Sequence, residues 1–491
     1  MTFSVHGSDV RRAVDSIPHD VSIPLVLDIE TLFATAIHHE SILFFLKRHP
    51  AWRLPYWLLR NRRTLKQSIS SALSDDEATS LPINEDLVAL AAEEASRGRE
   101  VVIVTSSNVP LNSKLQKQFV FVSNVLVLAD SGNSLDRSAK AKEIARRFPE
   151  GFIYAGNSAS DLDVWTVASA AILTRRSTTL QKQISERTEL FATVPAKRLG
   201  LNSLRRGLRV HQWAKNALIF VPLILGGKVA DASAWLYALG CFLAISLLAS
   251  STYVLNDLLD LADDRKHWSK RHRPLANGEL PIATGVGLMA GGAVLAFSIG
   301  LAIGQSCALM LLVYLCISLL YSWRLKREPL IDVFVLAALF SLRLGLGMVV
   351  ADVPFSMWLL VFSMFLFFSL STAKRQTEIA RMVEHGHRKT PGRGYYASDG
   401  PLLLALGVGA MIATVLIMVI YLVEDAFPVG YYKNPNFLWG FPVIIFLWLG
   451  RIWLLAHRGE LQDDPVAFAL KDRVSLIYGA MMVLIFAAAV A

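Results

Sequence analysis

The segment Val254–Gly278 (VLNDLLDLADDRKHWSKRHRPLANG) places many acidic and basic residues at the end of a long apolar run. If the helix expected in that run continues past Leu255, then Asp257, Asp260 and Asp264 lie on one helix face. Three carboxylates on one face repel one another unless a cation joins them. Hard oxygen ligands favour Mg²⁺, which often shares its coordination shell with substrate phosphates. The spacing therefore predicts a Mg²⁺ site that receives a phosphorylated substrate.

The basic residues that follow support the same hypothesis, because ammonium and guanidinium groups bind phosphate oxygens. They are Lys270, Arg271 and Arg273. The alternative is a solvated loop in which the acids pair with Arg265 and Lys266. The position favours a functional site, since Asn256 and Asp257 stand at the edge of an apolar run, where ionisable groups are costly.

The elements that must position these residues are membrane helices. Of the 491 residues, 53% are hydrophobic and 18% are charged, so the chain is too apolar to be wholly soluble. The composition changes near Lys215, after which apolar runs of membrane-spanning length follow. We expect nine spans, at Ala217–Gly227, Ala234–Leu255, Ala283–Gly304, Ala308–Trp323, Leu330–Val350, Phe355–Ala373, Leu402–Val423, Phe437–Ala456 and Val474–Ala491.

The loops between the expected spans alternate in charge. Lys and Arg gather in every second loop, and the intervening loops are short and nearly free of them. By the positive-inside rule, the amino terminus and the charged loops face the cytoplasm, and the carboxyl terminus lies on the far side. This topology and contacts with anionic lipid explain the net charge of +9, so we expect the lipid bilayer and no nucleic acid as a partner.

Before the membrane part, three apolar runs end in polar residues. SIPLVLDIETLF contains Asp28 and Glu30, REVVIVTSSN contains Thr105, and GFIYAGNSASDLDVW contains Asn157 and Asp161. These runs are typical of buried strands, and helical patterns lie between them. We therefore expect a parallel α/β sheet with a site at its carboxyl edge.

The acidic segment resembles a known motif. NDLLDLADD fits the NDxxDxxxD motif of the UbiA superfamily of intramembrane prenyltransferases, with Asn256, Asp257, Asp260 and Asp264 at the motif positions. The similarity extends from about Leu204 to the end of the chain. It implies an all-α membrane bundle in which Mg²⁺ ions hold a diphosphate against two acidic motifs on the cytoplasmic side.

Further segments resemble one branch of this superfamily, the decaprenyl-phosphate phosphoribosyltransferases of bacterial cell-wall synthesis. These segments are LRVHQWAKNALIFVPL, YSWRLKREPLIDV, AKRQTEI and DDPVAFALKDRV. Only Asp332 remains of the second acidic motif, as a further catalytic candidate, and an Asp332–Arg343 ion pair is the structural alternative. The resemblance implies that Lys326, Lys374 and Arg375 bind substrate. Positive-inside anchoring explains the last two about as well.

The resemblance implies transfer of 5-phosphoribosyl from phosphoribosyl diphosphate to a polyprenyl (decaprenyl-type) phosphate in a bacterial cytoplasmic (inner) membrane. The alternative is an aromatic prenyltransferase that uses a polyprenyl diphosphate lipid and an aromatic acceptor of the 4-hydroxybenzoate type. The same motif serves both reactions. A membrane transporter or scaffold is a third hypothesis, but the spans show no obvious inverted repeat, and the acids cluster at one membrane edge.

The amino-terminal segment resembles the haloacid dehalogenase superfamily. The resemblance assigns Asp28 as nucleophile, Glu30 as acid/base, Thr105 to the second motif, Lys140 to the third, and Asn157 and Asp161 to the metal-binding motif. Two departures stand out. Glu30 replaces an aspartate, and Asn157 replaces another, which removes a negative charge from a Mg²⁺ site. The domain is therefore either an active phosphatase or a degenerate regulatory or stabilising domain.

We thus expect a two-part chain. Residues 1–180 form an α/β Rossmann-like domain with a helical cap near 31–79, and residues 181–210 form a basic juxtamembrane linker. Residues 211–491 form an all-α transferase domain of about nine transmembrane helices.

Overall fold

The computed structural model describes residues 21–49, 68–69, 72–105, 119–130, 133–134, 137–195, 199–384, 386, 388–390, 393–461 and 465–491. Most of the expected cap, from Pro50 to Gln67, lies outside these residues, as do Asp463 and Asp464 of the segment DDPVAFALKDRV. The chain divides into two compact units. Unit 1 contains residues 1–207 and 257–287, and unit 2 contains residues 208–256 and 288–491.

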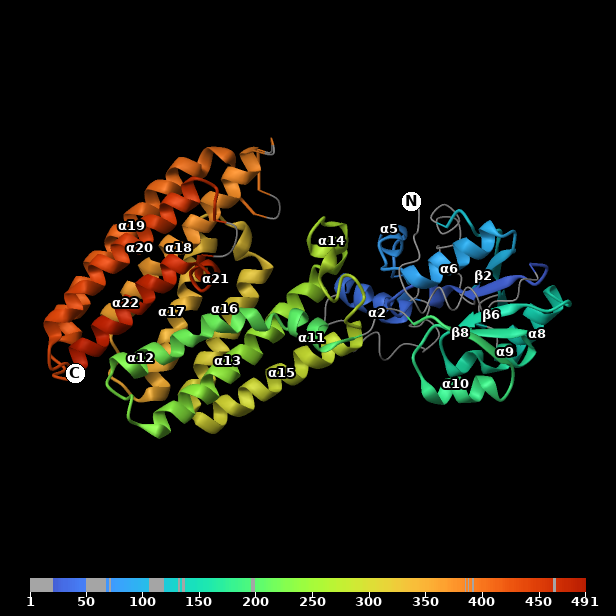
Figure 1. The fold of residues 1–491 in the computed structure, drawn as a ribbon, viewed down its shortest axis with the longest axis horizontal. Coiled ribbons are helices and arrows are strands. Elements are labelled where there is room, and N and C mark those ends of the chain that lie inside the picture. Colours follow the sequence, from blue (N-terminus) through green and yellow to red (C-terminus); the bar gives the residue numbers. More distant parts are fainter. Residues whose placement is uncertain are drawn as a thin grey trace. The chain divides into compact units, whose positions relative to one another are not determined.

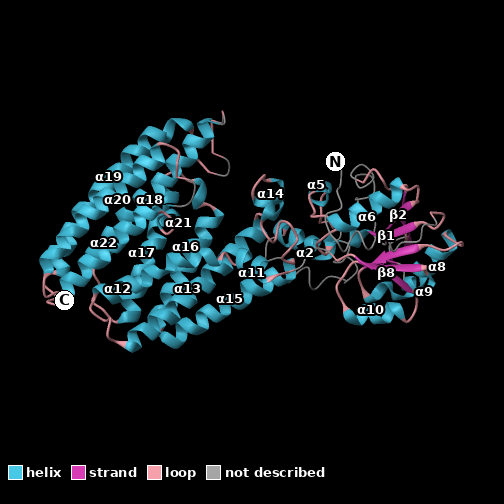
Figure 2. Cartoon of the chain, viewed as in Figure 1, coloured by secondary structure: helices cyan, strands magenta, loops and turns pink. Residues whose placement is uncertain are grey.

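Unit 1 is built on a six-stranded sheet whose ladders are all parallel. The strand order is β3-β2-β1-β6-β7-β8. The strands are β1 (Leu25–Asp28), β2 (Val101–Thr105), β3 (Asn124–Val127), β6 (Ile153–Gly156), β7 (Ala170–Leu173) and β8 (Glu189–Thr193). A separate antiparallel pair joins β4 (Ala129–Asp130) and β5 (Asn133–Ser134). The predicted parallel α/β sheet is confirmed, and Figure 2 shows its strands in magenta.

Helices cover both faces of this sheet, because its central strands are apolar on both sides. Leu25 and Leu27 of β1 belong to one hydrophobic core, and Val26 between them belongs to another. The first core is completed by α2 (Ile37–Arg48) and α6 (Glu85–Ser96), and the second by α8 (Arg137–Arg147), α9 (Leu162–Val167) and α10 (Thr178–Ser185). Figure 1 shows these elements around the sheet. Unit 1 also contains α5 (Asp75–Thr79), α11 (Leu201–Gly207) and the 3-10 turns η1 (Ile29–Leu32) and η3 (Ala159–Asp161).

The sheet extends beyond the expected domain boundary at residue 180. Strand β8 pairs in parallel with β7, and α10 is anchored in the second core by Leu180 and Ile184. The first half of the expected linker therefore folds as part of the α/β domain. Its apolar residues at strand and helix spacing outweigh its basic composition. Lys197 and Arg198 of the linker lie outside the described residues.

The rest of the chain is helical. Eight described helical segments are long and apolar enough to cross a membrane. They are α13 (Ala232–Leu259), α15 (Ile282–Ile303), α16 (Gln305–Trp323), α17 (Ile331–Ala351), α18 (Met357–Glu384), Ala397–Ala426 around α19 (Gly400–Tyr421), Pro435–His457 around α20 (Gly440–His457), and α22 (Arg473–Val490). The segment Ala397–Ala426 includes η7 (Ala397–Asp399) and η8 (Leu422–Ala426), and the segment Pro435–His457 includes η9 (Pro435–Trp439). Short elements between the eight segments are α14 (Leu261–Lys266), η5 (Lys270–His272), η6 (Leu325–Arg327) and α21 (Pro465–Ala469).

The first of the nine expected spans, Ala217–Gly227, is not among these eight. The chain there forms a 3-10 helix, η4 (Val210–Ile219), followed by a short α-helix, α12 (Phe220–Leu225). Pro222 explains the change, because its ring would clash with a carbonyl one turn earlier in a continuous α-helix. A 3-10 helix rises about 2.0 Å per residue and an α-helix about 1.5 Å. The 10 residues of η4 and the 6 residues of α12 therefore extend roughly 29 Å together, close to the thickness of a bilayer core.

Candidate active site

The acidic motif is split between two helices, contrary to the expectation of one continuous helix. Helix α13 ends at Leu259, so Asp257 lies on its last turn, and Asp264 lies on α14. Asp260 stands at the break with φ −91° and ψ 9°. Its carbonyl accepts the first hydrogen bond of α14 from the Asp264 N–H at 2.9 Å. The break changes the directions in which the three carboxylates point.

Two of the three carboxylates meet at one guanidinium group. Nη1 of Arg273 donates to Asp257 Oδ1 at 3.0 Å and to Asp264 Oδ2 at 2.5 Å. Asp257 and Asp264 are 4% and 1% exposed, so both charges are removed from water. Arg273, which the sequence predicts as a diphosphate ligand, therefore contacts the acidic motif and holds two of its carboxylates together.

The other oxygen of Asp264 is less well satisfied. Oδ1 is buried and has no hydrogen-bond partner, and the Lys270 ammonium lies 3.9 Å from it. Burial raises the pKa of Asp264, and the charge of Asp257 adds to this, whereas Arg273 lowers it; the net shift is upward. A carboxylate oxygen in this situation favours the approach of a further cation.

These residues fit a Mg²⁺ ion in part. Asp257 and Asp264 supply two carboxylates and an unsatisfied oxygen, which are hard ligands of the kind Mg²⁺ uses. Within the described part of the chain, no three His, Cys, Asp or Glu side chains lie close enough to form a complete metal cluster. A Mg²⁺ ion here would therefore take its remaining ligands from water and substrate phosphates, as Mg²⁺ commonly does.

The remaining residues of this segment lie nearby in the chain. Lys270 and Arg271 are exposed on η5. Asn256 is half-buried on α13, one position before Asp257. We call the set Asn256, Asp257, Asp260, Asp264, Lys270, Arg271 and Arg273 the first acidic motif.

A second charged cluster lies in unit 2, at the start of α17 and the end of α18. Asp332 is fully buried, and its Oδ2 accepts from Arg375 Nε at 2.7 Å and from Arg393 Nη1 at 3.4 Å. The Tyr395 hydroxyl donates to the other oxygen, Oδ1. Glu378 completes the cluster by accepting from Arg375 at 2.7 Å. Every charge in this Asp332 cluster thus has an opposite partner.

Tyr395 also fixes the backbone at the start of α17. Its hydroxyl accepts from the Leu330 N–H at 2.9 Å, and Leu330 has a positive φ of 65°, which is unfavourable for a residue with a side chain. Burial raises the pKa of Tyr395, and its hydrogen bond to Asp332 raises it further. Arg393 and Tyr395 were not predicted as site residues, because their loop has no pattern that marks them.

The alternative Asp332–Arg343 ion pair does not form. Arg343 donates instead to Asn216 Oδ1 at 2.7 Å, to the Leu339 carbonyl and to the Tyr314 hydroxyl. Its guanidinium also lies over the Tyr314 ring, 5.1 Å from the centroid. Asp332 and Arg343 are eleven positions apart on one helix, too far for a direct contact along its axis. The predicted Lys326 and Lys374 are half-buried, Lys326 on the short helix η6 and Lys374 in the second half of α18.

The strand ends of unit 1 bring a third group together. Lys140 Nζ lies 2.6 Å from Asp28 Oδ2 and 3.3 Å from Asp161 Oδ1. The Tyr154 hydroxyl lies 3.2 Å from the same two oxygens. The strand order reverses at β1, and ligands of α/β sheets bind at such positions. Asp28, Lys140 and Asp161, which are separated in the sequence, therefore lie together in the structure, and Tyr154 joins them.

The other predicted residues of this group occupy the same edge. Glu30 donates its backbone N–H to Asp28 Oδ1 at 2.9 Å. Burial raises the pKa of the Glu30 carboxyl, the charges of Asp28 and Asp161 add to this, and a hydrogen bond with Asn157 opposes it. Thr105 is buried at the end of β2. We call Asp28, Glu30, Thr105, Lys140, Tyr154, Asn157 and Asp161 the strand-end cluster.

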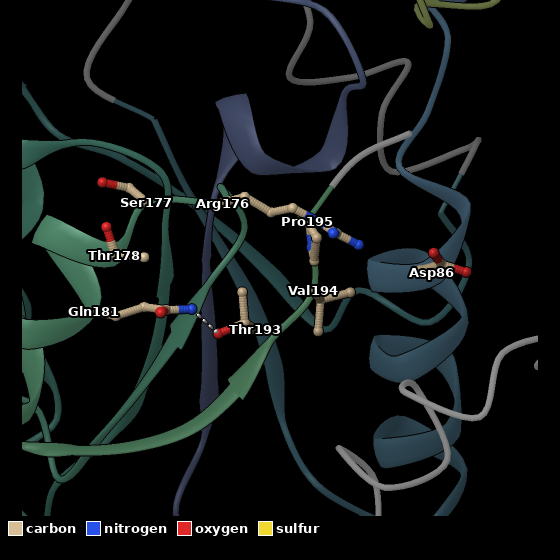
Figure 3. Close-up of a pocket in the computed structure, with 8 residues that line it drawn as sticks. All are labelled: Asp86, Arg176, Ser177, Thr178, Gln181, Thr193, Val194 and Pro195. Carbon is tan, nitrogen blue, oxygen red and sulfur yellow. Dashed lines mark hydrogen bonds between the residues drawn. The ribbon is translucent and has the colours of Figure 1, made fainter. Parts of the chain in front are cut away.

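A cavity of about 680 Å³ lies elsewhere in unit 1. Figure 3 shows its lining residues, among them Ser177 and Gln181 at α10 and Thr193 of β8. The Gln181 amide donates to the Thr193 hydroxyl across this space at 3.2 Å. The described residues that line this cavity include no member of the strand-end cluster, so the two are separate.

The fold and the motif together define a helical membrane protein with an acidic motif at a helix end. The chain matches the model of the UbiA prenyltransferase family over residues 219–490, and it belongs to that family. It is 37% identical to uncharacterized protein y4nM of Sinorhizobium fredii, over 94% of this chain and 90% of that protein. It is 35% identical to nodulation protein NoeC of Azorhizobium caulinodans, over 55% of this chain and 87% of that protein.

Two further comparisons also cover only part of the chain. A decaprenyl-phosphate phosphoribosyltransferase of Corynebacterium glutamicum is 32% identical over 38% of this chain and 57% of its own length. The structure of a UbiA homolog from Archaeoglobus fulgidus bound to GPP and Mg2+ is 18% identical, with a TM-score of 0.45, over 58% of this chain and 98% of that chain. The superfamily assignment made from the NDxxDxxxD motif is thus confirmed by the family match.

Proposed function

We propose that the chain is a Mg²⁺-dependent transferase that moves 5-phosphoribosyl from phosphoribosyl diphosphate to a polyprenyl phosphate. One observation carries the proposal. Arg273 holds Asp257 and Asp264 together, while Asp264 Oδ1 stays buried without a hydrogen-bond partner and Lys270 and Arg271 lie exposed beside it in the chain. Such an arrangement suits a metal-bound diphosphate. The similarity to a decaprenyl-phosphate phosphoribosyltransferase supports this choice of substrates.

The reaction requires little proton transfer. An oxygen of the lipid phosphate forms a bond to C1 of the ribose, and the bond from C1 to the diphosphate breaks with its electrons passing to the diphosphate. The protein must orient the two substrates and neutralise the leaving group. Asp257 and Asp264 would hold Mg²⁺, which supplies positive charge to that leaving group. Lys270 and Arg271 would bind its outer oxygens, and Arg273 orients the two carboxylates.

We assign the Asp332 cluster a supporting role. Asp332 was predicted as a catalytic residue, but its two oxygens already accept from Arg375, Arg393 and Tyr395. Those contacts favour a positioning function for Asp332 and Arg375. Lys326 and Lys374 are the members of this region that we propose for phosphate binding. By alternation of the spans, they and the first acidic motif share the cytoplasmic side of a bacterial inner membrane.

Substrate pairs distinguish this proposal from aromatic prenylation. Purified full-length protein is incubated with labelled phosphoribosyl diphosphate and polyprenyl phosphate, with and without Mg²⁺. We expect Mg²⁺-dependent appearance of labelled lipid. If no labelled lipid forms, and a polyprenyl diphosphate instead prenylates 4-hydroxybenzoate, the phosphoribosyl assignment is wrong and the aromatic alternative is correct.

The strand-end cluster favours a second candidate function, phosphomonoester hydrolysis. Asp28, with Lys140 at 2.6 Å, would act as the nucleophile, and Glu30, whose backbone N–H donates to Asp28, would act as the acid/base. The proposal predicts Mg²⁺-dependent phosphate release from phosphomonoesters by the full-length protein, abolished in Asp28→Asn. No release by the wild type would favour a stabilising domain, for which Lys140 and Tyr154 simply satisfy the charges of Asp28 and Asp161.

A further inference from the structure

The first acidic motif is connected to the α/β domain by a buried ion pair. Glu40, on α2, is fully buried, and Arg265 follows Asp264 directly on α14. Glu40 accepts from Arg265 Nη2 at 2.6 Å and from Nη1 at 3.2 Å, so the pairing is bidentate. Both side chains are at most 3% exposed. Two charges so far from water persist only because each satisfies the other.

Arg265 makes a third contact that reaches across the loop after α14. Its Nε donates to the Ala276 carbonyl at 3.3 Å. The same guanidinium therefore ties α14 and the far end of the 266–276 loop to Glu40. Between these two ends lie Lys270, Arg271 and Arg273, the cations proposed to bind or organise the diphosphate.

Further contacts join the segment 257–287 to the rest of unit 1. Ala262 of α14 packs against the core formed by β1, α2 and α6. Gly278 has φ +78°, and a Cβ there would approach Ala34 at 2.9 Å and Pro82 at 3.2 Å. Glu279 accepts from Ser203 of α11 at 2.6 Å. The segment 257–287 thus belongs to the same compact unit as the sheet, although its sequence lies between two membrane spans.

Charge at the α2 surface faces the motif as well. The Lys47 ammonium of α2 is within electrostatic range of Asp260 and Asp263. Helix α2 therefore provides the Glu40 carboxylate to Arg265. It also provides the Lys47 ammonium, which interacts with Asp260 and Asp263. Both interactions favour the observed orientation of α14, the helix that carries Asp264.

We propose that helix α2 of the α/β domain positions the first acidic motif, with Glu40 and Arg265 as positioning residues for diphosphate binding. The expected effect on diphosphate binding rests on the proposed function, whereas the Glu40–Arg265 ion pair is independent of it. Asp264 is adjacent to Arg265 on a six-residue helix, so loss of the ion pair releases Asp264 from its present direction. The α/β domain is then part of the transferase machinery whether or not its own strand-end cluster is catalytic.

The test compares Glu40→Gln with Glu94→Gln in the full-length protein. Glu94 pairs with Arg99 at 2.7 Å, both 1% exposed, so it is an equally buried acid of the same domain whose ion pairs are with Arg97 and Arg99. Amide hydrogen exchange of residues 257–278 and affinity for inorganic diphosphate with Mg²⁺ are measured for both. We expect Glu40→Gln to speed exchange there at least tenfold and to weaken diphosphate binding about tenfold, with Glu94→Gln close to wild type.

A charge-reversed variant, Glu40→Arg with Arg265→Glu, should restore part of the affinity, which general destabilisation would not allow. Equal effects of the two glutamine variants, or unchanged exchange in Glu40→Gln, would overturn the proposal. Faster exchange with unchanged diphosphate affinity would also overturn it. If the wild type transfers no phosphoribosyl group, the proposed reaction fails, and exchange and diphosphate binding still decide the positioning role.

Discussion

The first acidic motif and the Asp332 cluster both combine Asp with Arg at helix ends, but they differ in how fully the carboxylates are satisfied. In the Asp332 cluster both oxygens of the acid accept hydrogen bonds, from Arg375, Arg393 and Tyr395. In the first acidic motif one guanidinium serves two acids, and Asp264 Oδ1 accepts none. A satisfied cluster stabilises a fold, whereas an unsatisfied one retains capacity for a ligand.

The difference predicts opposite consequences of mutation. Removing an acid from the first acidic motif should reduce activity and leave stability nearly unchanged. Removing an acid from the Asp332 cluster should reduce stability first, because it leaves a buried guanidinium without its partner.

The largest effect is expected for Asp264→Asn, and likewise for Asp257→Asn. Either change removes a charge needed to hold Mg²⁺ beside the leaving diphosphate, so kcat/KM for transfer should fall about 1000-fold. Lys266→Gln is the control, because Lys266 is an exposed residue of α14 outside the first acidic motif. A similar loss in Lys266→Gln would indicate a general effect on α14, and near-normal turnover in Asp264→Asn would contradict the assigned role.

The next effect is on stability. Asp332→Asn leaves Arg375 and Arg393 with a weaker acceptor in a fully buried position, which should cost about 3 kcal/mol of unfolding free energy. The apparent melting temperature of the purified protein measures this loss. Glu384→Gln, an exposed acid on the same helix as Arg375, should change it little. An unaltered melting temperature in Asp332→Asn would show that this cluster is not structural.

A smaller effect is expected for Arg273→Gln. The change removes the shared donor of Asp257 and Asp264, which then repel each other and hold the diphosphate site less well. We expect KM for the diphosphate substrate to rise about tenfold, equivalent to roughly 1.4 kcal/mol. Lys266→Gln, an exposed cation on the same segment, serves as the control. A tighter KM in Arg273→Gln would mean that Arg273 competes with the ligand.

The smallest effect concerns pH. Because the pKa of Asp264 is raised above its usual 3.8, chiefly by burial, diphosphate binding should weaken as the pH falls through that raised value. Arg273→Gln should move this loss to higher pH, since Arg273 lowers the Asp264 pKa. Stability has the opposite sign: the contribution of Asp264 is present below pH 3.8 and is lost as the pH rises. An identical acid limb in both proteins would contradict this electrostatic coupling.

The sequence predicted the elements of this fold better than the contacts between them. The parallel sheet followed from apolar runs ending in Asp28 and Thr105, and eight spans followed from hydropathy. The first span was misjudged, because hydropathy does not distinguish an α-helix from the 3-10 helix that precedes Pro222. The boundary at residue 180 was misplaced, since basic composition concealed strand β8.

Among the site residues, the motifs marked residues that lie close together but did not predict their contacts. Arg273, expected to bind the diphosphate, contacts Asp257 and Asp264, and Lys140 contacts Asp28. Tyr154 and Tyr395 were missed, because a tyrosine in an apolar or loop segment carries no signal of the carboxylate it reaches. The Glu40–Arg265 pair joins residues 225 positions apart, and only tertiary structure reveals such a contact.

The central claim is that the first acidic motif, and not the Asp332 cluster, binds the diphosphate. Equilibrium binding of inorganic diphosphate with Mg²⁺ to full-length wild type, Asp264→Asn and Glu378→Gln tests it directly. Glu378 is a partly exposed member of the Asp332 cluster, so its substitution disturbs that cluster mildly. The account predicts at least a 100-fold loss of affinity in Asp264→Asn and a change within about threefold in Glu378→Gln. Wild-type affinity in Asp264→Asn, or the larger loss in Glu378→Gln, would contradict it.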